Sequence, residues 1–345
     1  SSKEAKKIIK VGVVGYGVIG RRVADAISAQ PDMDLIGVVK KKPDYKARLA
    51  IAKGFSLFSV DNEGTKTFAE SKIQVSGELK DLLDKIDIVV DASPSNVGAT
   101  NRKVYENYGV RVIYQGGESP EIAENSFVAQ CNYEKAKGKK SIRVVSCNTT
   151  GLCRILSSLD LNFGIERVRA MIIRRATDPD DTGKGIIDAV SVDPIKIPSH
   201  HGPDVNTVLP NLRIITTAVK IPTTHLHLHT LIISLKNNKT TEEQIIDSLS
   251  DMTRIILISG KDGFKSTGQL FDYARELGRW RSDLSELAVW KDSIRIIDSE
   301  LYVYMGVAQE AITVPENIDA IRAISGGYTR EESIGMTNKT LNILH

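Results

Sequence analysis

The sequence GYGVIG at residues 15–20 decides the fold of the first part of this chain, because it fits the pattern G-x-G-x-x-G. The motif begins at the end of residues 8–15, an apolar run typical of a buried parallel strand. Residues 18–29 then show helical periodicity. A glycine motif that joins a strand to a helix predicts the phosphate-binding turn of a dinucleotide-binding fold.

Each glycine of the motif has its own expected role. Gly15 allows a tight turn, Gly17 lets a pyrophosphate approach the backbone, and Gly20 lets the helix pack closely on the strand. Free N–H groups and the dipole at the helix N-terminus favour an anion at that place. The alternative is a tight turn between strand and helix that binds no ligand.

Further apolar runs follow at the spacing of strand–helix units. They occupy residues 35–39, 87–92, 110–114 and 142–146, and helical or loop segments separate them. Such alternation predicts an α/β fold with a doubly wound parallel sheet of the Rossmann type.

The pattern changes after Cys147. Longer alternating stretches rich in β-branched residues occupy residues 168–174, 212–219, 225–235 and 301–307. Residues 149–158 and 242–257 show helical patterns, and a further helix is predicted from Pro315 onwards. These patterns predict a second, α+β domain with a mostly antiparallel sheet.

The composition is that of an ordinary globular protein. The chain has 345 residues, of which 41% are hydrophobic and 26% charged, and its net charge is +3. These values exclude a disordered or collagen-like chain, and the charge is too balanced to indicate an obligate nucleic-acid partner. No apolar run reaches the ~18–20 residues that span a bilayer, so we expect no membrane partner. Three cysteines and an N-terminus without a signal-peptide pattern favour the cytoplasm.

The end of the second predicted strand bears on the choice of cofactor. A site specific for NAD usually has an acidic residue there, which binds the 2′-hydroxyl of the ribose. Here the strand runs into Lys40, Lys41 and Lys42, which would attract a 2′-phosphate. We therefore expect NADP and NAD to be used, with NADP preferred, and Lys40 and Lys41 to be the nearest cations. The alternative is a solvated run of lysines.

Cys147 lies at a junction between a predicted strand and a predicted helix. A helix N-terminus lowers the pKa of a thiol and favours the nucleophilic thiolate. Residues 148–150, Asn-Thr-Thr, add donors suited to an oxyanion or a phosphate. The alternative is a buried structural thiol, which is the interpretation we give to Cys131 and Cys153.

Five of the six histidines lie between positions 200 and 229. His225, His227 and His229 alternate with leucines, so on a strand their imidazoles would share one face. Three imidazoles on one face can bind zinc, but no cysteine or acidic residue lies within the motif. We expect no metal and favour an imidazole that acts as the base for a thiolate. The alternative is that one or two of these histidines simply form hydrogen bonds in the core or at its rim.

Arg174 and Arg175 end a predicted strand and begin a loop. Paired guanidinium groups at a strand end can bind a phosphate. A structural ion pair explains the same pattern equally well.

Together these segments resemble the archaeal type of glyceraldehyde-3-phosphate dehydrogenase over essentially the whole chain. The segment SCNTTGLCR at residues 146–154 is very specific, because the bacterial and eukaryotic branch has a differently ordered SCTTN segment. The other matching segments are GYGVIG (15–20), YQGGE (114–118), RRATDP (174–179), HGPDV (201–205), PTT (222–224) and VPENIDAIRA (314–323).

The resemblance implies roles for individual residues. Cys147 matches the catalytic nucleophile, and His227, the third residue after PTT, matches the catalytic histidine. The residues that match substrate or phosphate contacts are Ser146, Asn148, Thr149, Arg174, Thr177, His200 and His201. The residues that match cofactor contacts are Val18, Ile19, Gly117, Arg175 and Gln309. His225 departs from the family pattern, in which an apolar residue is usual at that position.

The resemblance also implies a reaction, the phosphorylating, NAD(P)-dependent oxidation of D-glyceraldehyde 3-phosphate to 1,3-bisphosphoglycerate, with inorganic phosphate as second substrate. Cys147 would attack the aldehyde, His227 would accept the proton, and a thioester would form. A homotetramer is also implied. Within each chain, residues 1–147 and 318–345 would form the dinucleotide-binding domain and residues 148–317 the catalytic domain. The alternatives are another semialdehyde dehydrogenase that forms an acyl phosphate, and a non-catalytic module that senses a dinucleotide or binds RNA.

Overall fold

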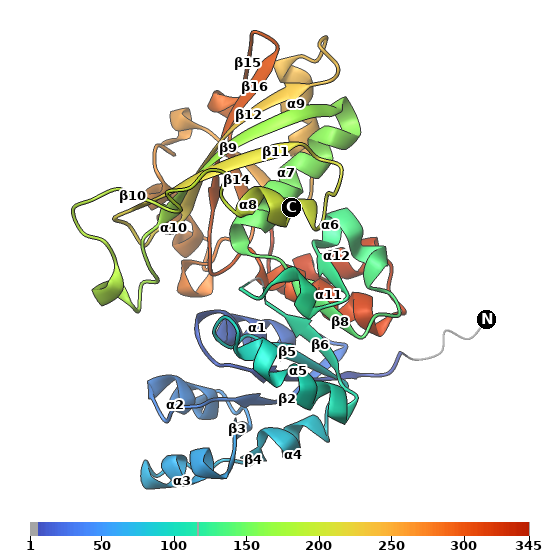
Figure 1. Cartoon of the computed structure of the whole chain (residues 1–345), viewed down its shortest axis with the longest axis vertical. Coiled ribbons are helices and arrows are strands. Elements are labelled where there is room, and N and C mark those ends of the chain that lie inside the picture. The colour runs from blue at the N-terminus through green and yellow to red at the C-terminus, as the bar shows by residue number, and fades with distance from the viewer. Residues whose placement is uncertain (1–5, 116, 345) are drawn as a thin grey trace. The chain divides into compact units, whose positions relative to one another are not determined.

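The computed structural model describes residues 6–115 and 117–344. Residues 1–5, Gly116 and His345 lie outside the described part, and Gly116 is the one residue of the YQGGE segment among them. The chain forms two compact units, each with its own sheet (Figure 1). They consist of Ser1–Ser146 with Val314–Asn342, and of Cys147–Thr313 with Ile343–His345. None of the described helices is long and apolar enough to cross a membrane.

The first unit is built on an eight-stranded sheet in the order β4-β3-β2-β1-β5-β6-β8-β7. Its strands are β1 Ile9–Val14, β2 Met33–Val39, β3 Leu57–Ser59, β4 Gly77–Glu78, β5 Ile88–Asp91, β6 Arg111–Tyr114, β7 Asn125–Phe127 and β8 Ser141–Val144. All of their pairings are parallel, and each apolar run predicted from the sequence is one of these strands. The doubly wound parallel sheet is thus confirmed. The strand order reverses between β1 and β5, and ligands of such folds bind beyond the carboxyl ends of the strands at this point.

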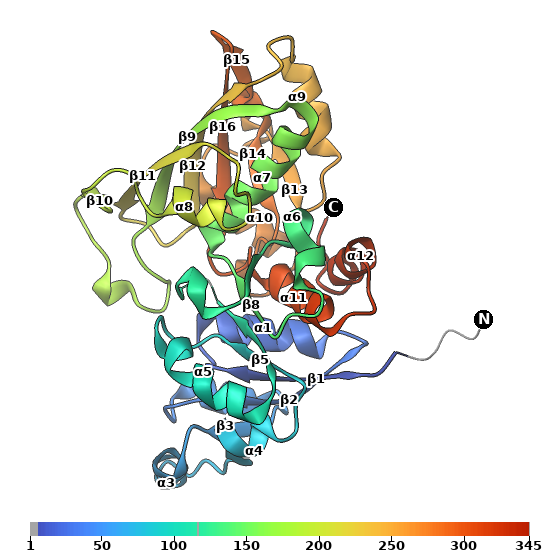
Figure 2. The ribbon, with the colours of Figure 1, turned by 45° about the vertical axis from the view of Figure 1, so that its right-hand side comes forward.

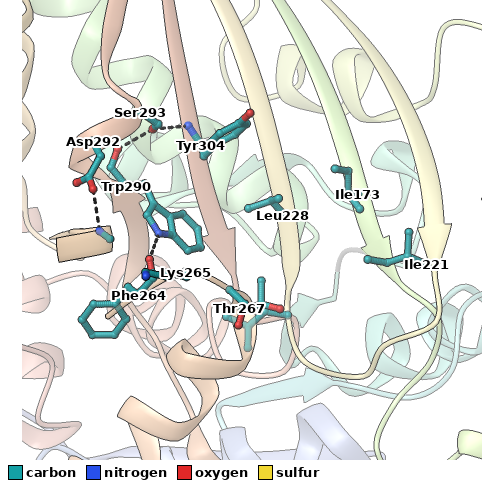
Figure 3. Close-up of a pocket in the computed structure, with 13 residues that line it drawn as sticks. Ile173, Ile221, Leu228, Phe264, Lys265, Thr267, Trp290, Asp292, Ser293 and Tyr304 are labelled. Carbon is teal, nitrogen blue, oxygen red and sulfur yellow. Dashed lines mark hydrogen bonds between the residues drawn. The ribbon is translucent and has the colours of Figure 1, made fainter. Parts of the chain in front are cut away.

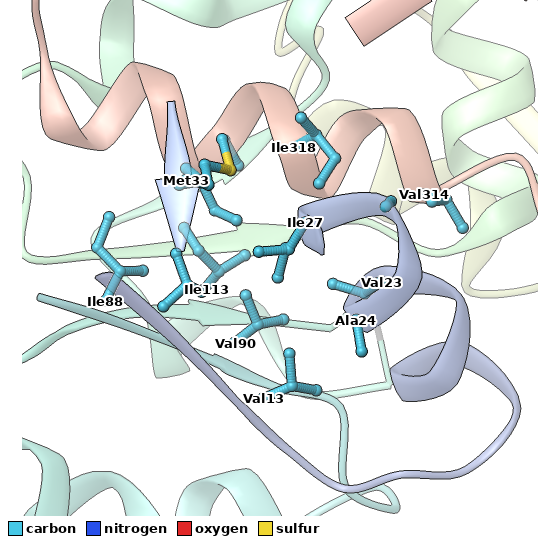
Figure 4. Close-up of a cluster of buried hydrophobic side chains, with 14 of the residues drawn as sticks. Val13, Val23, Ala24, Ile27, Met33, Ile88, Val90, Ile113, Val314 and Ile318 are labelled. Atoms are coloured by element: carbon cyan, nitrogen blue, oxygen red, sulfur yellow. The ribbon is translucent and has the colours of Figure 1, made fainter. Parts of the chain in front are cut away.

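Both faces of this sheet are buried, because its central strands are apolar at successive positions. Successive residues of β5 alternate between two hydrophobic clusters. One cluster is covered by α1 (Val18–Ser28) and α11 (Val314–Ser325), whose apolar side chains meet those of the strands in Figure 4. The other is covered by α4 (Leu79–Leu83) and α5 (Val97–Tyr108). The carboxyl ends of β1 and β5 are therefore held between two packed layers.

The C-terminal tail forms two helices, α11 and α12 (Arg330–Thr340), where the sequence predicted one. Gly326 and Gly327 between them have φ of 77° and 85°, the left-handed conformation that ends a helix. Arg322 of α11 is fully buried and donates to both oxygens of Asp32 at 2.8 and 2.9 Å. The remaining helices of this unit are α2 Tyr45–Ala52, α3 Asn62–Glu70, α6 Ala129–Asn132, η1 Pro120–Ile122 and η2 Tyr133–Ala136.

The second unit contains a mixed sheet in the order β10-β11-β9-β12-β16-β14-β13, with β15 paired to β16. Its strands are β9 Ile165–Arg175, β10 Ser191–Val192, β11 Ile214–Ile221, β12 His227–Leu235, β13 Ile255–Ile258, β14 Leu287–Trp290, β15 Arg295–Ile297 and β16 Glu300–Val307. The pairs β9–β11 and β13–β14 are parallel, and the other pairs are antiparallel. The prediction of a second, mostly antiparallel sheet is confirmed.

The helices of the second unit are α7 Cys147–Phe163, α8 His201–Asn206, α9 Glu242–Ser250, α10 Thr267–Glu276, η3 Thr182–Lys184, η4 Gly260–Asp262, η5 Trp280–Ser282 and η6 Lys291–Ser293. Both α8 and α9 pack against α7 (Figure 2). The predicted helix over residues 242–257 is wrong in its last part, because α9 ends at Ser250 and the chain returns as β13. Arg254, with φ of 62°, lies in the turn between them. Parallel pairing with β14 then satisfies the backbone of this apolar run, whose periodicity alone cannot distinguish a strand from a buried helix.

Candidate functional site

Two glycines shape the loop between β1 and α1. Gly15 has φ of +93°, and a Cβ there would lie 2.7 Å from the backbone nitrogen of Ser93. A Cβ on Gly20 would lie 1.8 Å from the carbonyl oxygen of Gly15. Any other residue at either position would therefore force the backbone to shift.

Gly17, in contrast, has open space where a side chain would be. It is the N-cap of α1, no described side chain caps that helix, and a Cβ on Gly17 would have no described heavy atom within 4 Å. The first turn of α1, which includes the half-buried Val18 and Ile19, carries no acidic residue. The loop thus offers backbone N–H groups beside open space at the positive end of a helix. This arrangement fits the pyrophosphate of a dinucleotide.

The segment after β5 packs against this loop and is held by Asp91, which the sequence interpretation missed. Asp91 is buried at the carboxyl end of β5 and accepts hydrogen bonds from Tyr105 Oη at 2.5 Å and from the Ser93 amide at 3.1 Å. Burial and the charge of Asp91 raise the pKa of Tyr105, so its hydroxyl remains a donor. Gly117 also approaches this segment, since a Cβ there would lie 2.6 Å from Ser95 Oγ. An acidic residue at the end of an apolar run was the available signal.

The lysines after β2 are partly engaged within the chain. Lys40 Nζ lies 3.0 Å from a carboxylate oxygen of Asp44. Asp44 also caps α2, because it accepts hydrogen bonds from two amides of the first turn. Lys41 and Lys42 are exposed. No acid follows β2 directly in the sequence, but the fold brings the carboxylate of Asp44 back to Lys40.

Cys147 is the first residue of α7 and directly follows Ser146. Its side chain is buried, and this burial raises the pKa of the thiol to about 11. The positive charges of Arg174 and Arg175 and the amide of Asn148 act in the opposite direction but do not compensate. The expectation of a lowered pKa is therefore wrong for this arrangement, because lost hydration outweighs the helix N-terminus.

His227 begins β12 and is subject to the charges of the same two arginines. Its Nδ1 accepts a hydrogen bond from the Arg175 amide at 2.9 Å, and its buried Nε2 has no partner among the described residues. Burial, followed by the charges of His229 and Arg175, keeps the pKa of His227 well below its usual range. A neutral ring that accepts at Nδ1 carries its proton on Nε2. His227 therefore presents an N–H donor at Nε2.

The two residues after Cys147 are held from other elements. Asn148 Oδ1 lies 2.7 Å from Nε2 of His229, a fully buried residue of β12. Thr149 donates a hydrogen bond to Asp204 of α8 at 2.6 Å. The sequence interpretation missed both pairings, although Asp204 stands in the HGPDV segment.

His225 does not share a face with His227 and His229, so the prediction of three aligned imidazoles is wrong. Leu226 has φ of 66°, which breaks the alternation just before β12 begins. The His225 ring instead stacks on Phe271 at a centroid distance of 4.2 Å. Within the described residues, no group of three or more His, Cys, Asp or Glu side chains could hold a metal ion.

The arginines at the end of β9 form ion pairs, which is the alternative that their sequence pattern left open. Arg174 pairs with Asp193. The buried Arg175 side chain donates to Asp178, Gln309 and Glu310, and to the carbonyl of Thr224 at 3.3 Å. Thr177 follows in the loop and donates to the carbonyl of Asp181 at 3.2 Å. Both guanidinium groups are thus oriented by carboxylates that the sequence interpretation did not single out.

His200 and His201 lie at the start of α8, with their ring centroids 4.1 Å apart. His200 is exposed, whereas His201 is buried and its Nδ1 lies 2.9 Å from Ser199 Oγ. Burial, with the charges of His200 and Arg174, lowers the pKa of His201 to about 3. His201 also acts on the pKa of His227. The second unit therefore gathers these groups with Cys147 in one cluster.

Comparison with known proteins adds independent findings. Residues 146–293 match the family model described as glyceraldehyde 3-phosphate dehydrogenase, C-terminal domain, and residues 9–117 match that described as dihydrodipicolinate reductase, N-terminus. The chain is similar to the glyceraldehyde-3-phosphate dehydrogenase of Archaeoglobus fulgidus, with 49% identity over 97% of this chain and 98% of the relative. It is 48% identical to the enzymes of that name from Methanothermus fervidus and Thermococcus kodakarensis, over 97% of this chain and 99% of each relative.

Proposed function

Because this chain belongs to the glyceraldehyde-3-phosphate dehydrogenase family, we propose that it oxidises D-glyceraldehyde 3-phosphate, with inorganic phosphate and NAD(P), to 1,3-bisphosphoglycerate. One observation supports this reaction most directly. The buried thiol of Cys147 at the start of α7 and the ring of His227 are influenced by the same two arginine charges, and Nε2 of His227 has no hydrogen-bond partner among the described residues. A module that only senses a dinucleotide or binds RNA has no use for such a pair.

Cys147 supplies the nucleophile. After its proton has passed to solvent, the thiolate attacks the aldehyde carbon, so that a C–S bond forms and the carbonyl oxygen becomes an oxyanion. The bound dinucleotide supplies the acceptor for the hydride that leaves this carbon. The oxyanion then reforms the carbonyl as a thioester. Inorganic phosphate attacks the same carbon, the C–S bond breaks, Cys147 leaves as the thiolate, and the product is an acyl phosphate.

His227 acts as a hydrogen-bond donor in this proposal. Its neutral ring carries a proton on Nε2, because Nδ1 accepts from the Arg175 amide. A ring in this tautomer can stabilise an oxyanion, but it can accept a proton only at the nitrogen that is already occupied. The contacts of His227 therefore favour a donor role over the role of base.

The substrate carries one phosphate and inorganic phosphate is a second anion, so the site must hold both. The residues that we assign to substrate and phosphate are Ser146, Asn148, Thr149, Arg174, Thr177, His200 and His201. Arg174 suits this role because its buried Nε has no partner among the described residues, while another nitrogen of the same group pairs with Asp193. His200 is exposed and can be reached by an anion.

For the cofactor we propose both NADP and NAD, with NADP preferred. The glycine loop would hold the pyrophosphate that the two cofactors share. The preference would come from the exposed Lys41 and from Lys40, which is shared with Asp44. The residues that we assign to the cofactor are Gly15, Gly17, Val18, Ile19, Gly20, Lys40, Lys41, Gly117, Arg175 and Gln309.

We further propose a homotetramer in the cytoplasm. On the face of the second sheet opposite His229, Met171, Ile215 and Tyr304 are 42%, 44% and 51% exposed. The same face contains a pocket of about 700 Å³ with mostly apolar walls (Figure 3). In the segment between β9 and β11, Ile187 and Ile195 are 79% and 84% exposed. Apolar surface of this kind favours contact with another chain, and a second copy is the partner that the family implies.

The reaction is tested by following reduced cofactor after mixing the protein with glyceraldehyde 3-phosphate and NADP, with and without inorganic phosphate. We expect reduction that depends on phosphate, and none with aspartate semialdehyde as control substrate. The proposal is contradicted if the protein turns over only aspartate semialdehyde, or if it turns over neither of the two compounds. Sedimentation equilibrium tests the assembly, and the mass of a monomer would contradict the tetramer.

A further inference from the structure

His229 forms a buried pair with Asn148, and the proposed function above gives His229 no role. His229 lies in the middle of the sheet, where it pairs with Ile172 of β9 and Met305 of β16, so strands on both sides fix its backbone. Asn148 is the second residue of α7, directly after Cys147. The two residues are 0% and 3% exposed, and His229 Nε2 lies 2.7 Å from Asn148 Oδ1. A rigid strand therefore holds the side chain next to the nucleophile.

The chemistry of the two groups fixes the direction of this hydrogen bond. A carboxamide oxygen only accepts, so His229 Nε2 donates, and the neutral ring carries its proton there. Burial lowers the pKa of His229 to about 3, which keeps the ring neutral near neutral pH. Its Nδ1 is buried and has no partner among the described residues. His229 is thus a donor with one fixed target and not a proton carrier.

This bond leaves the other end of the carboxamide for a different partner. Asn148 Oδ1 is occupied by His229, and within the described residues nothing accepts a hydrogen bond from Asn148 Nδ2. A carboxamide can rotate by half a turn and exchange its two ends. If it did so here, an acceptor oxygen would take the place of the Nδ2 donor.

We propose that His229 is a positioning residue, which by donating to Asn148 Oδ1 fixes the carboxamide so that Nδ2 donates to the substrate oxyanion at Cys147. The inference rests on the proposed function, because the oxyanion is an intermediate of that reaction. Asn148 then contacts the reacting atoms, and His229 acts only through Asn148. A donor that is used when negative charge has developed raises kcat and has little effect on KM.

The first test compares three substitutions at His229 by kcat and KM for glyceraldehyde 3-phosphate. His229→Gln places an amide N–H near the position of Nε2, His229→Asn places the same amide near the position of Nδ1, and His229→Phe removes the donor. We expect the Gln variant to keep kcat within about threefold, and the other two to lose about ten- to a hundredfold in kcat at similar KM. Equal losses in the Gln and Asn variants, or losses mainly in KM, would overturn the inference.

The second test is a double-mutant cycle with Asn148→Ala, which itself should cost about 10²–10³ in kcat. If His229 acts through Asn148, adding His229→Asn to Asn148→Ala costs no more. Losses that multiply would show an independent, structural role and overturn the inference. The wild type separates the two proposals. Without phosphate-dependent turnover the proposed function and this inference both fail, whereas an active wild type with multiplying losses overturns this inference alone.

Discussion

The glycine loop of the first unit and the cysteine cluster of the second are built by different means. The loop consists of consecutive residues, and missing side chains set its shape, since a Cβ on Gly20 would meet the backbone at 1.8 Å. The cluster consists of side chains from α7, α8, β9 and β12, and its central pair, Asn148 and His229, is 81 positions apart in the chain. One site is local in sequence and the other depends on the whole second unit.

The electrostatics of the two regions differ in the same way. The loop leaves backbone N–H groups beside open space, so it attracts an anion without burying any charge. In the cluster, burial is the largest influence on Cys147, His201, His227 and His229, and it favours the neutral form of each. Changes in the loop should therefore act on binding, and changes in the cluster on the chemical step.

The largest effect is expected from the nucleophile. Cys147→Ser should lower kcat by roughly 10⁴ or more, because the hydroxyl is a far weaker nucleophile than the thiolate, while binding of the cofactor to the glycine loop persists. Cys153→Ser, a buried residue of the same helix, is the matched control and should mainly affect packing. Turnover and cofactor titration check both variants. Inactivation by iodoacetamide that maps to Cys131 or Cys153 would contradict this assignment.

The second prediction concerns the pH dependence of the same thiol. Only the thiolate is alkylated, and burial raises the pKa of Cys147 from 9.0 to about 11. At pH 8 the folded protein should therefore react with iodoacetamide about a hundredfold more slowly than the unfolded chain does. The rate should rise about tenfold per pH unit up to roughly pH 10. A rate that levels off below pH 9 would show that the arginines, and not burial, control the thiol.

The fold of the first unit could be predicted from the sequence to a large extent. Its central strands are buried on both faces and therefore appear in the sequence as continuous apolar runs. The glycine motif requires one particular turn between a strand and a helix. In the second unit, the prediction of secondary structure failed where pairing with distant residues decides the structure. The run that forms β13 looks helical by periodicity, and only its parallel partner β14 makes it a strand.

The cluster around Cys147 could be anticipated from the sequence in its residue types but not in its contacts. The position of Cys147 at the start of a helix follows from local pattern, and the structure has it there. The raised pKa of its thiol does not, because burial is a property of the assembled unit. The partners Asp193, Asp204 and Glu310 likewise come from distant segments of the chain, and single-sequence patterns carry no signal for such pairs.

The third prediction uses two glycines of the loop as a matched pair. Gly17→Ala should fold normally, because its Cβ would point into open space, but should weaken binding of NADP and NAD alike by about tenfold. Gly20→Ala should destabilise the protein by about 3 kcal/mol, because its Cβ would meet the Gly15 carbonyl. Thermal melting and cofactor titration separate these effects. Unchanged affinity in the Gly17 variant would show that no pyrophosphate approaches this backbone.

The smallest expected effect lies at the end of β2, where the two cofactors differ. A ribose 2′-phosphate carries nearly two negative charges at neutral pH, whereas NAD has only a hydroxyl there. One charge-assisted contact contributes about 1.5–3 kcal/mol in a protected site, and less at an exposed lysine. We expect the double substitution Lys40→Ala, Lys41→Ala to weaken NADP by up to about tenfold and to leave NAD unchanged.

Asp44 allows the same idea to be tested in the opposite direction. Its carboxylate lies 3.0 Å from Lys40 Nζ, so it neutralises one of the two cations that the 2′-phosphate would meet. Asp44→Asn removes this charge but keeps an oxygen that can cap α2, since Asn is as good an N-cap as Asp. NADP should therefore bind a few-fold more tightly to this variant, NAD should not, and the gain should shrink as salt screens the lysines. Titration of both cofactors at low and high salt measures this. Equal changes for NADP and NAD would mean that the lysines after β2 are only a solvated charge run, and that cofactor choice is made elsewhere.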